Sequence, residues 1–157
     1  MKNVMVGVIF LGALCSQTLA QEPNWRAMPT YTTANLSAGF WPDPWSISIQ
    51  AGGSMQTPSY LGRDCVGFIQ TQAPDVDLNY NAGSLSLYIH VQSRADTTLV
   101  INAPDGRWYC NDDTIGTNPM VVFSNPLSGN YNIWVGTYRN SGLEPATLLI
   151  TEIDPRR

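Results

Sequence analysis

The stretch DTTLVINAPDGRWYCNDD, residues 96–113, holds two short runs of β-forming residues on either side of a turn signal. In APDG (103–106), proline occupies the second turn position, aspartate the third and glycine the fourth, which is typical of a tight β-turn. A turn in which Ala103 faces Gly106 gives these pairs: Ile101 with Trp108, Leu99 with Cys110, and Asp96 with Asp113. Because the apolar residues of these pairs then share one face, the stretch predicts a β-hairpin with Cys110 turned toward the core.

Acidic residues gather at the open end of this predicted hairpin. Asp96 faces Asp113 there, with Asp112 beside it and Asn111 nearby. Directly opposed like charges destabilise a strand pair, so a cation should neutralise them. Calcium binds carboxylate, amide and carbonyl oxygens, and the loop NDDTIGTNP supplies such groups, although without the spacing of an EF-hand. We therefore predict a calcium site at these four residues; the alternative is that they are solvated or accept turn hydrogen bonds.

Short runs rich in valine, isoleucine, threonine and aromatic residues recur along the chain between turn-forming clusters, and no long segment has apolar residues at helical spacing. This pattern predicts an all-β protein. The expected strands are WSISIQA, CVGFIQT, DVDLNY, SLSLYIHVQS, TTLVINA, RWYCN, MVVFS, YNIWVGTY and ATLLITEI. We expect a two-sheet antiparallel β-sandwich, jelly-roll-like, with about 8–9 strands over residues 44–157. Residues 21–43 contain several prolines and no sustained period, and are expected to form an arm laid over the sandwich.

Residues 1–20 predict a secretory signal peptide, with Lys2 before a short apolar run and small residues leading to cleavage after Ala20. The apolar run is shorter than the ~20 residues of a spanning helix, so we expect an exported protein, periplasmic or secreted, without a transmembrane segment. Of the three cysteines, Cys65 and Cys110 remain after cleavage. In an oxidising compartment such a pair predicts a disulfide, worth about 3–4 kcal/mol for a loop of this length.

The charge balance restricts the class of ligand. With Lys2 removed, the 12 acidic residues outnumber the basic ones, all of which are scattered arginines. Nucleic acids and anionic membrane surfaces favour clustered basic residues, so neither is expected as a partner. An acidic chain is compatible with a divalent cation.

The run that opens this section, followed by NPMVVF, SGNYNIWVGTY and ATLLITE, resembles the bacterial pre-peptidase C-terminal domain over about residues 84–152. The segments AGFWPDPWSISIQAGG and CVGFIQTQAPD are similar to those of small exported proteobacterial proteins that are often labelled serine peptidases. The resemblance implies a jelly-roll β-sandwich, frequently appended to secreted proteases, that in some members binds calcium or docks polymeric substrates.

The match can be carried over residue by residue. The family's acidic positions correspond to Asp96, Asn111, Asp112 and Asp113, and its closing strand to Gly129, Tyr131 and Val135. The family module normally follows a catalytic domain, whereas here it makes up nearly the whole mature chain.

The residue types needed for hydrolysis are scarce. His90 is the single histidine, Lys2 the single lysine, and no GxSxG motif surrounds a serine. One histidine also falls short of a catalytic zinc site. Asp75 and Asp77 share a strand face and form the one carboxylate pair to consider, with a solvated edge as the alternative. We therefore favour a non-catalytic binding or accessory module; the alternative is a small secreted hydrolase that uses His90 or this pair.

Five tryptophans are many for a domain of this size. Exposed rings can stack on sugars or anchor a protein partner, so the expected ligand is a protein or a polysaccharide. The hairpin register directs Trp108 into the core, whereas strand alternation turns Trp134 outward. Trp41 and Trp45, in WPDPW, either pin the arm to the sandwich, which we favour, or belong to a binding surface. The candidate ligand-binding aromatics are therefore Trp41, Trp45 and Trp134.

Overall fold

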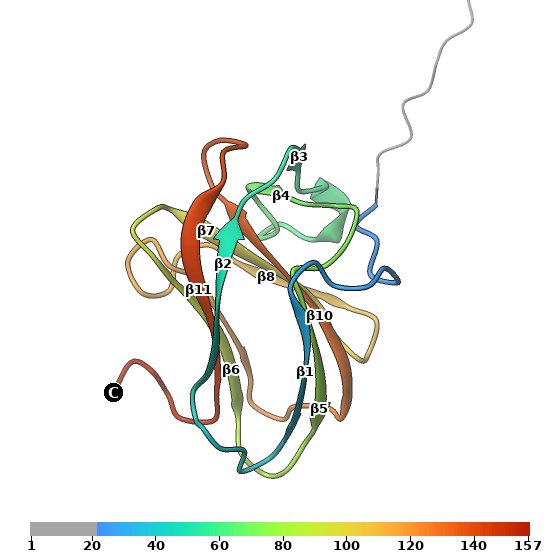
Figure 1. Cartoon of the computed structure of the whole chain (residues 1–157), viewed down its shortest axis with the longest axis vertical. Coiled ribbons are helices and arrows are strands. Elements are labelled where there is room, and N and C mark those ends of the chain that lie inside the picture. The colour runs from blue at the N-terminus through green and yellow to red at the C-terminus, as the bar shows by residue number, and fades with distance from the viewer. Residues whose placement is uncertain (1–21) are drawn as a thin grey trace, which may run out of the picture.

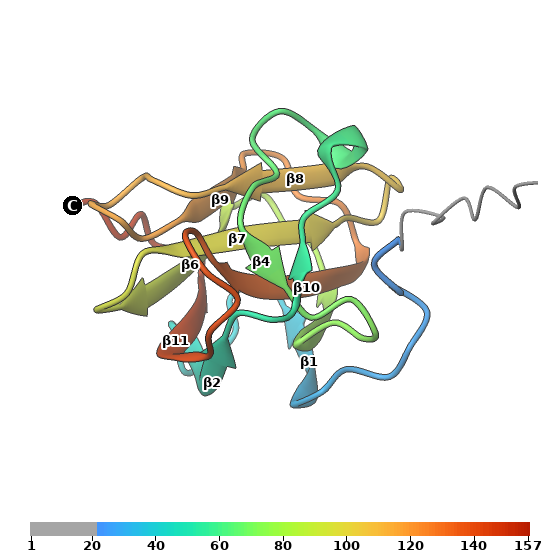
Figure 2. The same ribbon diagram turned by 90° about the horizontal axis from the view of Figure 1, so that it is seen from above.

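A computed structural model describes residues 22–157, so the predicted signal peptide lies outside the described residues. Two β-sheets pack face to face (Figures 1 and 2). The elements are β1 (Thr32–Ser37), β2 (Trp45–Ala51), β3 (Met55–Gln56), the 3-10 helix η1 (Ser59–Leu61), β4 (Phe68–Ile69), β5 (Val76–Asn81), β6 (Leu87–Ser93), β7 (Thr97–Asn102), β8 (Trp108–Asn111), β9 (Met120–Phe123), β10 (Gly129–Thr137) and β11 (Glu144–Thr151). Over residues 22–157 there is no helix with the length and hydrophobicity of a membrane span.

Strand β10 is the centre of the larger sheet. It pairs with β5 and then β4 along one edge and with β7 along the other; β8 follows β7, β1 lies beyond β5, and β3 beyond β4. The smaller sheet has the order β2-β11-β6-β9. Every pair is antiparallel except β1 with β5. The all-β sandwich expected from the sequence is confirmed, and its jelly-roll connectivity stays a prediction.

The main core lies between the two sheets because alternate residues of each strand turn inward. Fully buried side chains from both sheets meet there: Val76, Leu78, Leu87, Ile89, Leu99, Ile101, Tyr131, Ile133, Leu148 and Ile150. At one end the Phe123 ring packs edge-on against Tyr109 and Tyr131, with centroids 5.0 and 5.1 Å away. Strand alternation therefore brings the apolar side chains of these strands to the inner face.

Each of the nine expected runs contains a strand, but two strands were not anticipated, β1 and β3. β1 lies within residues 21–43, where the sequence predicted an arm; it is instead an edge strand of the larger sheet. Ala34 is buried and Leu36 half-buried on its inner side, which is too short an alternation to register as a period among the prolines. The sandwich therefore begins before residue 44.

The hairpin of β7 and β8 is shifted by one residue from the predicted register. Val100, not Leu99, faces Cys110, and Asn102, not Ile101, faces Trp108. The Ala103 N–H donates to the Arg107 carbonyl, and Gly106 has a φ of +75°, so the loop has three residues and ends in a glycine bulge. A slip of one residue moves side chains to the opposite face. Cys110 and Trp108 therefore lie on the outer face of the sheet, away from the main core.

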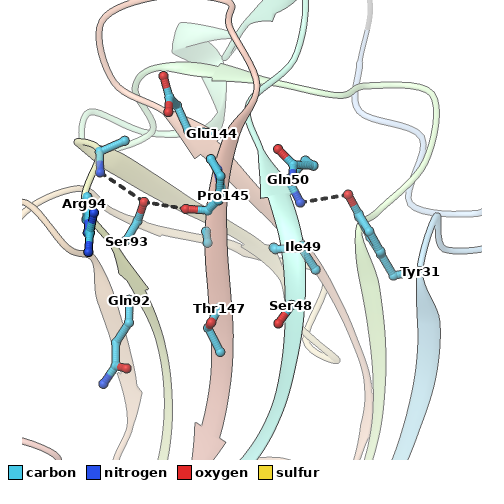
Figure 3. Close-up of a pocket in the computed structure, with 12 residues that line it drawn as sticks. Tyr31, Ser48, Ile49, Gln50, Gln92, Ser93, Arg94, Glu144, Pro145 and Thr147 are labelled. Carbon is cyan, nitrogen blue, oxygen red and sulfur yellow. Dashed lines mark hydrogen bonds between the residues drawn. The ribbon is translucent and has the colours of Figure 1, made fainter.

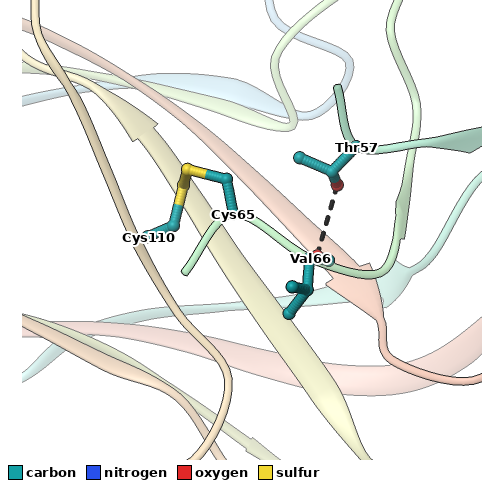
Figure 4. The surroundings of a disulfide bond; sticks show 4 residues. All are labelled: Thr57, Cys65, Val66 and Cys110. Atoms are coloured by element: carbon teal, nitrogen blue, oxygen red, sulfur yellow. Dashed lines mark hydrogen bonds between the residues drawn. A yellow bond between two sulfur atoms is a disulfide. The ribbon is translucent and has the colours of Figure 1, made fainter. Parts of the chain in front are cut away.

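A second, smaller core forms on that outer face. Val100 and Trp134 lie beneath Leu61, Cys65 and Ile69, with Trp108 and Cys110 packed at the side. We call residues 57–67 the covering loop. Its base is closed by the Thr57 N–H, which donates to the Gly67 carbonyl, and by the Thr57 hydroxyl, which donates to Val66 (Figure 4).

The predicted disulfide between Cys65 and Cys110 is confirmed, with their Cα atoms 4.9 Å apart (Figure 4). It ties the covering loop to β8, within one side of the sandwich, and does not join the two sheets. Gly67 allows this loop to approach the sheet closely: its φ is +89°, and an added Cβ would lie 2.5 Å from the Thr137 carbonyl oxygen. The disulfide therefore fastens a cover over an apolar patch.

Candidate functional site

The predicted calcium ligands do not meet as the sequence suggested. With the register shifted, Asp96 does not oppose Asp113, and its carboxylate instead lies 3.4 Å from Arg139 Nε. The Asn111 side-chain oxygen accepts hydrogen bonds from the Met120 N–H and the Thr114 hydroxyl. Residues 22–157 contain no group of three or more acidic, histidine or cysteine side chains placed to hold a metal ion. The four residues therefore do not form a ready-made donor set in the described chain, and calcium binding stays a prediction.

The predicted aromatic residues are dispersed. Trp41 is 89% exposed in the loop between β1 and β2, and Trp45 is half-buried against the main core. Trp134 does point to the outer side of its sheet, as alternation predicted, but the covering loop leaves it 0% exposed. The prediction that the Trp134 ring binds a ligand is therefore wrong. Trp108, expected in the main core, packs instead against Trp134 with ring centroids 5.5 Å apart.

The residues of the hydrolase alternative lie on opposite sides of the sandwich. His90 belongs to the outer face of the smaller sheet, where it is 3% exposed and its Nδ1 has no partner among the described residues. Burial lowers the pKa of His90. The histidine is thus buried, and no hydrogen bond at Nδ1 orients it as a catalytic base.

Asp75 and Asp77 lie on the outer side of the larger sheet. Asp75 is 3% exposed. Its carboxylate accepts a hydrogen bond of 2.7 Å from the Val135 N–H, which lies beyond the part of β10 that pairs with β5. Burial raises the pKa of Asp75 to about 7. Asp77 is half-buried and accepts a hydrogen bond from Asn132. Each carboxylate has a structural partner, and His90 is separated from both by the main core.

Polar side chains that sequence reasoning did not select come together on the outer side of the larger sheet. We call this set the amide face; it consists of Asn35, Asp77, Asn79, Asn102, Asn130 and Asn132. Four strands, β1, β5, β10 and β7, contribute these residues. They alternate with core residues along each strand, and the sheet register aligns them in two rows across the strands.

The first row runs from β10 through β5 to β1. Asn130 donates to the Asn79 side-chain oxygen at 3.0 Å, and Asn79 donates to Asn35 at 2.9 Å. All three are exposed. A carboxamide offers two N–H donors and an oxygen that accepts twice, so each amide keeps hydrogen-bonding capacity for a ligand.

The second row lies next to the first and is more buried. Asn132 donates to Asp77 at 2.7 Å and faces Asn102 across the β10–β7 pair; beyond Asn102 the row ends at Trp108. Burial raises the pKa of Asp77, and the hydrogen bond from Asn132 opposes that rise. This bond fixes the Asn132 and Asp77 side chains relative to each other.

Two connected grooves follow these rows and share Gly129 and Asn130. The first, of about 400 Å³, is lined by Asn35, Asn79 and their neighbours. The second, of about 480 Å³, has Trp108, Trp25 and Glu22 on its walls. Trp25 is 38% exposed, and the Arg26 guanidinium lies 4.1 Å from its ring centroid. The amide face thus carries indole rings at one end.

A further groove, of about 770 Å³, lies on the outer side of the smaller sheet over β2, β11 and β6 (Figure 3). Its lining mixes polar and apolar side chains and includes Arg94 and Glu144, which form no salt bridge with each other. Tyr31 stands at one side and uses its hydroxyl to accept the Gln50 N–H. No tryptophan lines it, so it offers less to a sugar ring than the amide face does.

A signal for the amide face exists in the sequence. Asparagines stand at alternate positions in LNYN (78–81) and GNYNIW (129–134), which places them on one side of each strand. The sequence does not say that these two strands are neighbours, so the rows become visible only in the sheet.

Comparisons with known proteins gave structural similarity alone. No family model matches the chain, and no curated protein matches it. Among solved structures, it is similar to the pre-peptidase C-terminal domain of collagenase from Bacillus anthracis, at 14% identity and a TM-score of 0.46, covering 80% of this chain and 100% of that one. It is also similar to Aeromonas hydrophila PliG, a periplasmic lysozyme inhibitor of g-type lysozyme, at 14% identity and a TM-score of 0.40, covering 78% and 98%. The domain that the sequence resembles is thus among these structures.

Proposed function

We propose that this chain is an exported, non-catalytic binding module that holds an uncharged polysaccharide on the amide face. One observation carries the proposal: two cross-strand rows of amide and carboxylate groups lie along connected grooves that end at Trp25 and Trp108. The predicted signal peptide and the disulfide support a place in the periplasm or outside the cell.

The chemistry of these groups suits a sugar chain. Amides and carboxylates can each take two hydrogen bonds, and neighbouring hydroxyls on a pyranose present a matching pair of donors and acceptors. Indole rings pack against the C–H faces of sugars through their large apolar area. The rows are fixed by sheet register and by their own hydrogen bonds, so little side-chain freedom is lost on binding.

Charge narrows the class of polysaccharide. The lining of the two grooves includes Glu22, and Asp77 lies in the adjoining row; no lysine or arginine lines either groove. An anionic polymer would meet these carboxylates, and the nearby Arg26 guanidinium is already stacked on the Trp25 ring. Neutral polysaccharides are therefore the expected ligands.

The proposal can be tested by native affinity electrophoresis of the purified chain in gels that contain a soluble neutral glucan, mannan or xylan, with pectin and alginate as anionic polymers. We expect retardation by at least one neutral polymer and by neither anionic one. Asn130→Ala and Trp25→Ala should each raise the dissociation constant at least about tenfold, a typical loss for a central contact.

Matched controls use the same residue types elsewhere on the surface. Asn125→Ala and Trp41→Ala lie outside the two grooves and should bind like the unmodified chain. Equal loss in Trp41→Ala, or no retardation by any neutral polymer in the panel, would contradict the proposal.

A further inference from the structure

Strand β2 ends the smaller sheet, and one hydrogen bond fixes which of its backbone groups face the open edge. The Gln50 N–H points away from β11 and donates to the Tyr31 hydroxyl at 2.8 Å. Its opposite residue on β11 is Pro145, which has no N–H to offer. Gln50 therefore occupies a non-hydrogen-bonded position of the β2–β11 pair.

Alternation extends this conclusion along the strand. In an antiparallel ladder every second residue directs both its N–H and its C=O to the same side, so Ser48 and Ser46 share the orientation of Gln50. The β2–β11 register runs without a bulge from Ala51 to Trp45. Tyr31 occupies the edge at Gln50 alone. Ser46 and Ser48 thus present four backbone groups to the open edge.

This edge lacks the features that usually protect one. Natural edge strands carry charged residues, prolines or bulges that prevent pairing with another chain. The strand WSISIQA has none of these over its seven residues. By contrast, the exposed edges of β8 and β9 have only four residues each.

Apolar side chains next to the edge are incompletely covered. Trp45 and Ile47 of β2 are half-buried, and so are Leu36 and Phe40, which precede β2 in the chain. A strand added beside β2 would extend the smaller sheet and bury more of the Trp45 and Ile47 side chains. The edge therefore suits an added strand whose inward residues are apolar.

We propose that β2 pairs antiparallel with β2 of a second copy of this chain, about a two-fold axis at Ile47. Ser46 then faces the partner's Ser48, and Ile47 faces the partner's Ile47. The open backbone groups of Ser46 and Ser48 fall at hydrogen-bonded positions and make four bonds in all. The two sheets of four strands become one of eight.

Self-complementarity is what favours a second copy over an unrelated peptide. The two-fold axis places serine hydroxyls opposite one another on the outer side of the sheet. On the inner side it places Trp45 opposite the partner's Ile49. The strand carries no charge, so two acidic copies meet here without like charges opposed. The paired segment ends before Gln50, whose N–H already donates to the Tyr31 hydroxyl. The amide face belongs to the other sheet and stays open in the dimer.

The oligomeric state tests this proposal. Sedimentation velocity of the mature chain over a range from about 1 μM to 1 mM should show a reversible monomer–dimer equilibrium, weak because a strand edge is a small interface. Ser48→Pro removes a backbone N–H that has no partner in the monomer, and edge strands tolerate proline at such positions. It should raise the dimer dissociation constant at least tenfold while the circular dichroism spectrum stays that of the folded chain.

Charged variants at Ser46 and Ser48 test the same pairing if the proline variant misfolds. S46K/S48K places two lysines opposite two lysines across the axis, and S46D/S48D does the same with aspartates. Each should be monomeric alone, and an equimolar mixture should recover the dimer. Ser54→Lys, just beyond the strand, is the control and should dimerise normally.

Three outcomes would overturn the proposal. The chain could remain monomeric at 1 mM, the dimer could persist in both charged variants, or the mixture could fail to associate. Amide hydrogen exchange adds a local readout: the Ser46 and Ser48 N–H groups should gain protection with rising protein concentration, whereas protection only after addition of a different extended peptide would assign the edge to another partner.

Discussion

The outer side of the larger sheet has two halves that the same strands build in opposite ways. Toward one end, Trp134 and Val100 of β10 and β7 lie under the covering loop. Two residues away on the same strands, Asn132 and Asn102 belong to the buried row of the amide face, and the exposed row lies next to it. An apolar row requires a cover, whereas amide side chains satisfy one another and can face water. A single strand can therefore contribute residues both to the covered core and to the proposed binding surface.

The largest expected effect on stability comes from removing a buried side chain in the covered half. Trp134→Ala should lower the free energy of unfolding by about 3–5 kcal/mol, because a fully buried indole leaves a cavity. Trp41→Ala removes the same side chain from an exposed loop and should change stability by less than about 0.5 kcal/mol. Urea denaturation followed by far-UV circular dichroism measures both. Similar costs for the two variants would contradict the burial assigned to Trp134.

The next effect tests how the cover is fastened. Replacing both cysteines, Cys65→Ser with Cys110→Ser, should cost about 3–4 kcal/mol, since the disulfide closes a long loop in the unfolded chain. Because the disulfide spans only the covered half, binding at the amide face should be retained at temperatures where the variant is folded. Loss of polysaccharide binding in the folded variant would show that the two halves are coupled.

These two halves also show what the sequence could and could not predict. The disulfide followed from the cysteine count, and the inward side of Leu99 and Ile101 and the outward side of Trp134 followed from alternation. The hairpin register did not, because APDG fits both a two-residue turn and a three-residue loop with a glycine bulge, and nothing local separates them. The choice moved Cys110 to the other face and separated Asp96 from Asp113.

The second limit of sequence reasoning is that a residue can be buried by a segment far away in the chain. Alternation placed Trp134 outward correctly, but the covering loop comes from more than 60 residues earlier in the chain, so its burial is invisible to any local pattern. The amide face has the same origin, since its rows require β1, β5, β10 and β7 to be neighbours. Local periodicity predicts the side of a strand on which a residue lies, and tertiary structure decides what covers that side.

Asp75 directly precedes β5, beside the covered half, and links stability to pH. Burial raises its pKa from 3.8 to about 7 in the folded chain, so the folded state binds the proton more tightly than the unfolded state. The resulting stabilisation is complete below about pH 4 and is lost as the pH rises from there through 7, with a size on the order of 4 kcal/mol. Asp75→Asn should flatten this part of the stability profile. Thermal melts between pH 4 and 8 measure it, and an unchanged slope in the variant would assign the dependence to another group.

A smaller effect is expected in the open half. Asn79→Ala removes the middle amide of the first row, but Asn35 and Asn130 are exposed and can bond to water instead. Stability should fall by about 0.5 kcal/mol, while the dissociation constant for a neutral polysaccharide rises severalfold. Asn125→Ala serves as the control for both measurements. A large loss of stability would mean that the first row maintains the fold rather than a binding surface.

The smallest effect concerns calcium at Asp96, Asn111, Asp112 and Asp113. Arg139 already lies beside the Asp96 carboxylate, and Asn111 already accepts two hydrogen bonds, so a cation would compete with existing partners. We expect weak binding, in the ~10⁻⁴–10⁻³ M range typical of extracellular modules. Millimolar calcium should then raise the melting temperature by about one to two degrees and magnesium should not, with the calcium effect absent after Asp112→Asn with Asp113→Asn. If calcium and magnesium act alike, or the double variant responds as the unmodified chain does, these acids are solvated surface groups, and the disulfide and the second core alone stabilise this side of the sandwich.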